Sequence, residues 1–156
     1  MRPQYETAAD RLVEGEVKAL LRNQYNLVCH KLPISYRVDW IVYAPGTVAN
    51  PDRLHGFIEL KGRKVPRNRY PTLILSLAKF AAGCDLARVT NTPFWVGARW
   101  TDGLGFCRAD GYDVEVQMGG RTDRGDSADI EPVIHLPIKE FQDAPLESRL
   151  PYRVFV

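Results

Sequence analysis

The sequence predicts a single α/β domain built around one mixed β-sheet, and three observations support this. Apolar residues recur at helical spacing in Thr7–Asn23 and again in Thr72–Ala87. Between these segments, Tyr36–Tyr43 and Gly56–Lys61 alternate apolar and other residues, as strands do. A strand-like apolar run follows the second helical segment. The expected order is a helix, an antiparallel three-stranded meander, a helical crossover and further strands that extend the sheet.

Length and composition are those of one globular domain, residues 1–156, which can bury a core without disulfides or structural metal. The formal net charge of +2 neither demands nor excludes a polyanionic partner. Three widely spaced cysteines and three histidines without common ligand spacing disfavour a zinc ribbon, a disulfide framework and a histidine metal site. No apolar run reaches membrane-spanning length, and residues 1–6 lack the apolar core of a signal peptide, so a soluble, cytoplasmic protein is expected.

The first helix is predicted over Thr7–Asn23, and a short strand over Leu27–Leu32. The apolar stripe of this helix is formed by Val13, Val17, Leu20 and Leu21. Its acidic residues fall on one side, so a helix packed on the sheet would bring Glu14 near the central strands. A solvated acidic stripe is the alternative for these residues.

Asp39, Glu59 and Lys61 are placed on neighbouring strands by the alternation of the two central segments. In Tyr36–Tyr43, Asp39 is on the face opposite to the apolar residues, and in Gly56–Lys61 the same period puts Glu59 and Lys61 together. The apolar residues of the opposite faces are Val38, Trp40, Val42, Ile58 and Leu60. A segment rich in turn-forming residues between the strands favours an antiparallel return. Two acids and an amine are therefore expected to converge; the alternative is a solvated strand face with an incidental ion pair.

Carboxylates at short range bind a hard divalent cation, and an ammonium beside them can position or deprotonate a water. Asp39, followed by Glu59-Leu60-Lys61 on the next strand, resembles the PD-(D/E)XK nuclease (restriction-endonuclease-like) superfamily, and more closely a small phage-encoded branch of it. The likeness runs over nearly the whole chain, with one departure: Val38 replaces the proline before the first acid. A second Glu-x-Lys copy, which ends at Lys18, lies inside the first helical pattern and has no acid on an adjoining strand.

The resemblance implies a restriction-endonuclease-like core in αβββαβ order with extra C-terminal strands. It also implies a nuclease that uses Mg²⁺ or Mn²⁺ to hydrolyse phosphodiester bonds in phage nucleic-acid metabolism, with DNA as the expected substrate. Asp39, Glu59 and the carbonyl of Leu60 would hold the metal. Lys61 would orient or activate the attacking water, and Glu14 would bind a second metal or tune the first. Dimers are common where both strands are cut, so a homodimer is one expected form.

Cationic residues follow the Glu59-Leu60-Lys61 strand in a loop that contains two prolines. They are Arg63, Lys64, Arg67 and Arg69, and the expectation is that they contact a nucleic-acid backbone. The second helix is predicted over Thr72–Ala87, and the resemblance places its Ser76 and Lys79 beside the metal-bound phosphate. A solvated basic loop and a solvent-exposed lysine are the alternatives.

The last third of the chain is predicted to supply further strands. Phe94–Trp100 and Leu104–Arg108 flank the turn signal Asp102-Gly103 and are expected to form a hairpin. Further strands are expected over Tyr112–Met118 and over Glu131–Ile138, the latter continuing into a short helix that ends at Phe141. Residues 119–129 form a polar, turn-rich segment that is expected to be a mobile or functional loop.

A different function is a catalytically inactive nucleic-acid-binding or interaction protein that keeps the nuclease-like fold. Two clustered acids beside a polyanion weigh against it, because a binding module without a cation has no use for them.

Binding of a divalent cation separates these two functions. Mn²⁺ at about 100 times its dissociation constant is expected to stabilise the wild-type protein by about 2.7 kcal/mol, and Asp39→Ala by less. The shift in melting temperature measures this difference, and identical shifts in both proteins would favour the binding module.

Overall fold

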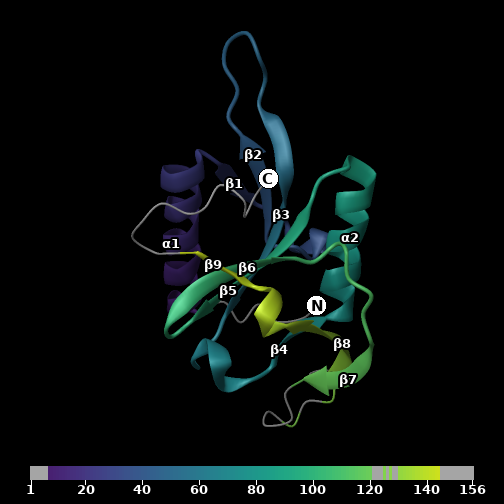
Figure 1. Ribbon diagram of the computed structural model, residues 1–156. Coiled ribbons are helices and arrows are strands. Elements are labelled where there is room, and N and C mark those ends of the chain that lie inside the picture. Colours follow the sequence, from purple (N-terminus) through teal and green to yellow (C-terminus); the bar gives the residue numbers. More distant parts are fainter. Residues whose placement is uncertain (1–6, 121–124, 126, 128–129, 145–156) are drawn as a thin grey trace.

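The computed structural model describes residues 7–120, 125, 127 and 130–144, and two helices flank a mixed sheet within them (Figure 1). Helix α1 spans Ala8–Tyr25. It begins at Thr7, whose side chain accepts a hydrogen bond from the Asp10 N–H at 3.2 Å while the Asp10 carboxylate accepts one from the Thr7 N–H at 2.8 Å. This reciprocal capping fixes the start of the helix where the sequence predicts it. The helix runs two residues beyond the predicted end, because Asn26 adopts the left-handed conformation that terminates it.

The central sheet has six strands in the order β1-β2-β3-β5-β6-β9 within the described residues. Their bounds are β1 Val28–Lys31, β2 Trp40–Ala44, β3 Arg53–Gly62, β5 Phe94–Trp100, β6 Gly103–Arg108 and β9 Gln142–Ala144. Neighbouring strands are antiparallel except β3 and β5, which are parallel and are connected through helix α2 (Leu77–Thr90). The predicted meander, helical crossover and hairpin are therefore confirmed.

The two helices cover opposite faces of this sheet (Figure 1). On one face, Val17, Leu20 and Leu21 of α1 pack against Trp40, Val42 and Ile58. On the other, Phe80 and Ala87 of α2 pack against Phe57, Phe94 and Val96. None of the described helices is long and apolar enough to cross a membrane. Among the described residues, Glu59 is the one charged side chain that is buried, and it lies on the face covered by α2.

The alternation predicted Val38 on the same face as Trp40 and Val42, and this is wrong. Val38 packs in the cluster on the opposite face. The chain before β2 is not extended. A 3₁₀ turn, Ile34–Tyr36, ends at Arg37 with a left-handed φ of 61°, and the strand starts only at Trp40. A period of two cannot be extended backwards through such a turn.

The start of the predicted second helix is wrong, because Thr72–Ser76 is strand β4 and the helix begins at Leu77. Leu73 and Leu75 point into the core, opposite Leu136 and Ile134 of strand β8 (Ile130–Pro137). The pairing with β8 provides hydrogen-bond partners for the backbone of this segment. Five residues are too few for their spacing to distinguish a helix from a strand. Pro71 disfavours a helical conformation in the residue before it, and Tyr70 is extended, with φ −129° and ψ 151°.

The late strands do not all extend the central sheet. Strands β4, β8 and β7 (Gln117–Gly120) form a second, three-stranded antiparallel sheet within the described residues. Residues 112–116, predicted as strand, are irregular, although Tyr112 and Val114 pack against the core. The short helix predicted before Phe141 is a 3₁₀ turn, Ile138–Glu140, and a further 3₁₀ turn spans Arg67–Arg69. The polar loop predicted over residues 119–129 lies largely outside the described residues.

Helix α2 packs closely against strand β5 at Gly83, and this contact can be tested. A Cβ at Gly83 would lie 2.3 Å from the ring of Phe94, whereas one at Gly15 of α1 would meet nothing within 4 Å. Gly83→Ala is expected to lower the free energy of unfolding by about 1–3 kcal/mol through overpacking. Gly15→Ala, the matched control, is expected to raise it by up to about 1 kcal/mol through helix propensity. Urea denaturation measures both, and a Gly83→Ala protein as stable as wild type would contradict the close contact.

Candidate active site

A pocket of about 360 Å³ opens beside the start of β2 and the end of β3, with α1 and α2 contributing to its walls. Its charged lining residues are Asp10, Glu14, Lys31, Arg37, Asp39, Glu59, Lys61 and Lys79. The 3₁₀ turn at Ile34–Tyr36 lies at the same pocket, where Ile34 is part of the lining although most of its side chain is exposed to solvent. The sequence does not point to Arg37 or Ile34, because Arg37 falls in the predicted strand Tyr36–Tyr43 and Ile34 falls just before it.

Asp39 and Glu59 are brought together by the antiparallel register of β2 and β3, in which Trp40 pairs with Ile58. The N–H of Asp39 donates to Glu59 Oε2 at 3.2 Å, and the N–H of Leu60 donates to Asp39 Oδ2 at 2.9 Å. Each carboxylate is therefore oriented by a backbone group of the neighbouring segment, and the pair is positioned by the sheet itself.

Two ammonium groups contact the same carboxylate oxygen. The Nζ of Lys61 lies 3.0 Å from Glu59 Oε1, and the Nζ of Lys79 lies 2.5 Å from that oxygen and 4.0 Å from Asp39 Oδ1. Glu59 is fully buried, with 0% of its surface exposed, so these contacts replace the hydration of its carboxylate. The four side chains form a compact cluster with two negative and two positive charges.

The electrostatics of the cluster are dominated by burial. Burial and then the neighbouring Glu59 raise the pKa of Asp39 from 3.8 to about 6, against the opposing effects of Lys79, the Leu60 N–H and Lys61. For Lys79, burial alone would lower the pKa, but the attraction of Glu59 and Asp39, with a smaller contribution from Glu131, leaves it above its ordinary value. The acids are therefore crowded, and Lys79 is held as a cation.

Glu14 also lies at the pocket, on the side formed by α1. Its carboxylate forms an ion pair with Lys31 of β1, with the Lys31 Nζ 2.9 Å from Oε1. The packing of α1 on the sheet thus brings this third acid to the pocket, but in a pair with a lysine.

The four cations of the loop after β3 fall into two groups. Arg63 donates to the carbonyl of Ile74, and burial lowers its pKa. Arg67 donates to the carbonyls of Ile138 and Phe141, forms an ion pair with Asp143 and lies over the ring of Trp100 at 5.3 Å. These two side chains hold the loop against the fold. Lys64 and Arg69 are exposed.

Ser76 and Lys79 both lie at the start of α2, but they have different surroundings. Lys79 lines the pocket, whereas Ser76 Oγ donates to Glu131 Oε2 on β8 at 3.1 Å. Glu131 is the acid that the sequence did not single out. Only the pairing of β4 with β8 brings it beside the start of α2, and no local pattern predicts that pairing.

The raised pKa of Asp39 makes a pH-dependent prediction. The folded state binds this proton more tightly than the unfolded chain, so the contribution of Asp39 to stability is greatest near pH 4 and falls as the pH rises to about 6. Asp39→Asn, which keeps an acceptor for the Leu60 N–H, avoids this loss. In EDTA at pH 8 it is expected to be about 3 kcal/mol more stable than wild type, with little difference near pH 4.

Urea denaturation across this pH range measures the difference, and the same substitution at the exposed Asp113 is the control. An Asp39→Asn protein that is less stable than wild type at pH 8 would contradict the crowding of the two acids.

Two comparisons with known proteins found similar ones. A family model described as "Phage putative PDDEXK endonuclease" matches residues 1–144. Among solved structures, the Holliday junction resolvase Hjc of Archaeoglobus fulgidus, an archaeal hyperthermophile, is similar with a TM-score of 0.49 and 14% identity, over 83% of this chain and 89% of that chain. No curated protein matches the chain significantly. Because the family model covers nearly the entire chain, the protein belongs to this phage PDDEXK endonuclease family.

Proposed function

We propose that the protein is a divalent-metal-dependent nuclease that hydrolyses phosphodiester bonds of DNA, with Asp39 and Glu59 as metal ligands. The observation that carries this proposal is the convergence of two carboxylates and two ammonium groups at one pocket. Neighbouring carboxylates attract a divalent cation, and ammonium groups beside them suit an anionic substrate. Membership of an endonuclease family supports the same chemistry.

The donor set fits Mg²⁺ or Mn²⁺. These ions favour oxygen ligands, and Mg²⁺ is usually held by one or two carboxylates together with water and substrate oxygens. In the described residues, no group of three or more His, Cys, Asp or Glu side chains is arranged to hold a metal. Asp39 and Glu59 would supply two carboxylates, and substrate oxygens and water would complete the coordination. We include the carbonyl of Leu60 as a third protein ligand.

The residues around these ligands have separate roles in the proposed reaction. A bound divalent cation would polarise the phosphodiester and lower the pKa of a water. Lys61, with its Nζ 3.0 Å from Glu59 Oε1, would orient the attacking water and help to remove its proton. The Leu60 N–H, 2.9 Å from Asp39 Oδ2, would keep that carboxylate in position. Glu14 would bind a second cation or tune the first, which requires its ion pair with Lys31 to open.

Contacts to the nucleic-acid backbone are proposed for the cations that remain accessible. Lys64 and Arg69 are exposed in the loop after β3, and Lys79 lies in the pocket. Arg63 and Arg67, which donate to backbone carbonyls, would support this loop and contribute through their charge. Ser76 would position the start of α2 through its hydrogen bond to Glu131.

Cleavage of labelled DNA and RNA, with EDTA, Mg²⁺ or Mn²⁺, tests the proposal directly. Wild type is expected to cut in Mg²⁺ or Mn²⁺ and not in EDTA. Lys61→Ala is expected to lose on the order of 100-fold or more in rate, and Asp39→Ala at least as much. Lys18→Ala removes the lysine of the other Glu-x-Lys sequence, on α1, and is expected to cut as wild type does.

The opposite result identifies the other function. If wild type cuts no substrate but binds nucleic acid equally well with and without the Asp39 carboxylate, the protein is a binding module and the nuclease proposal is wrong.

A further inference from the structure

Glu59 Oε1 contacts two lysine ammonium groups. A metal ion bound to the same oxygen would displace at least one of them. Lys61 Nζ is 3.0 Å away and Lys79 Nζ is 2.5 Å away. Lys79 is also 4.0 Å from Asp39 Oδ1, so it bridges the two acids on which the proposed function depends. A divalent cation on these acids would repel both ammonium groups at contact distance.

Lys79 has the greater freedom to leave. Lys61 is on the same strand as Glu59, two residues further on, so the sheet keeps its side chain on the same face. Lys79 comes from helix α2, and its side chain is 34% exposed, compared with 22% for Lys61. A long, partly exposed lysine can change rotamer without disturbing the sheet.

A further acid, Glu131, lies at the start of α2. Glu131 on β8 is held by a 3.1 Å hydrogen bond from Ser76, the N-cap residue of α2, and it attracts the Lys79 ammonium electrostatically. Ser76 precedes Lys79 by three residues, so the start of α2 contacts both Glu131 and the Asp39–Glu59 pair. An ammonium that leaves the first pair can keep an anionic partner without becoming fully solvated.

We propose that Lys79 is the internal counter-ion of the Asp39–Glu59 pair, and that a divalent cation entering the pocket displaces it toward Glu131. This inference rests on the proposed function, because it requires a cation at those acids. In this role Lys79 has two opposing effects. It stabilises the metal-free protein, and it competes with the metal for the same carboxylate oxygens.

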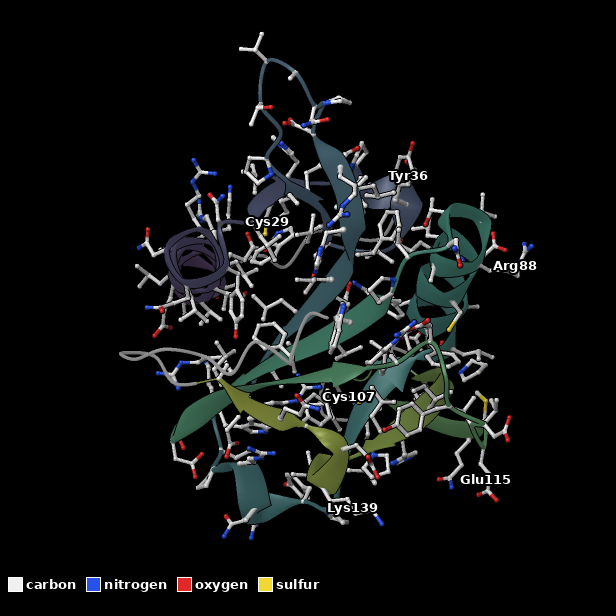
Figure 2. All side chains as sticks on the ribbon, turned by 45° about the horizontal axis from the view of Figure 1, so that its top comes forward. Cys29, Tyr36, Arg88, Cys107, Glu115 and Lys139 are labelled. Atoms are coloured by element: carbon white, nitrogen blue, oxygen red, sulfur yellow. The ribbon has the colours of Figure 1, made fainter. Side chains whose placement is uncertain are left out.

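The affinity for Mn²⁺, measured by calorimetry at pH 8 on protein stripped of metal, tests this role. Lys79→Met is expected to bind Mn²⁺ at least about tenfold more tightly than wild type, since a cation in contact with a carboxylate changes its proton affinity by about 10- to 1000-fold. Lys79→Gln, which keeps a polar end, is expected to show the same direction. Lys139→Met is the matched control: Lys139 is exposed on the 3₁₀ turn after β8, at the opposite end of the molecule from Tyr36 beside the pocket (Figure 2).

The outcomes separate the two proposals. Mn²⁺ binding that is equal or weaker in both folded Lys79 variants, while wild type binds Mn²⁺, would overturn the role of Lys79 and leave the nuclease proposal intact. Absence of Mn²⁺ binding by wild type and by both variants would overturn the proposed function and this inference with it.

The destination of Lys79 has its own test. Glu131→Gln is expected to weaken Mn²⁺ binding by several-fold in the wild-type background, where Lys79 needs its second partner, and to have a smaller effect in the Lys79→Met background. Equal effects in the two backgrounds would overturn Glu131 as that partner.

Discussion

A carboxylate without exposed surface needs all of its partners from the protein, and Glu59 takes them from three places in the chain. Asp39, just before β2, supplies a backbone N–H, β3 supplies Lys61, and α2 supplies Lys79. A buried charge without partners is strongly destabilising. The fold therefore tolerates Glu59 in the core only if all three segments are correctly placed. The strand pairing, the crossover and the pocket are therefore consequences of one another.

The cluster could be predicted from the sequence because its central part is local. Asp39 directly precedes β2, Glu59 and Lys61 lie on β3, and a turn-rich connection joins the two strands. A period of two puts Glu59 and Lys61 on the same face of β3. The same reasoning found the hairpin of β5 and β6. Where the chain turned just before β2, the period failed, and Val38 went to the opposite face.

Features that depend on distant segments could not be predicted in this way. Thr72–Ser76 has spacing compatible with either helix or strand, and pairing with β8 decides between them. Glu131 is brought to α2 by that same pairing. Arg67 appeared in the sequence as one of several loop cations, yet its guanidinium binds backbone carbonyls, and residue type alone does not distinguish that role from contact with a phosphate.

The pairing of β4 with β8 also constrains the order in which the protein folds. It joins Thr72 to Pro137, whereas the hairpin of β2 and β3 closes over a much shorter loop. Closing a long loop costs more chain entropy, so the hairpin is expected to form early and the β4–β8 ladder late. A nascent chain would therefore hold its two acids together before the strand carrying Glu131 has emerged to fix the start of α2. In this order of events, the start of α2, which supplies Lys79 to the pocket, is fixed after the two acids are in place.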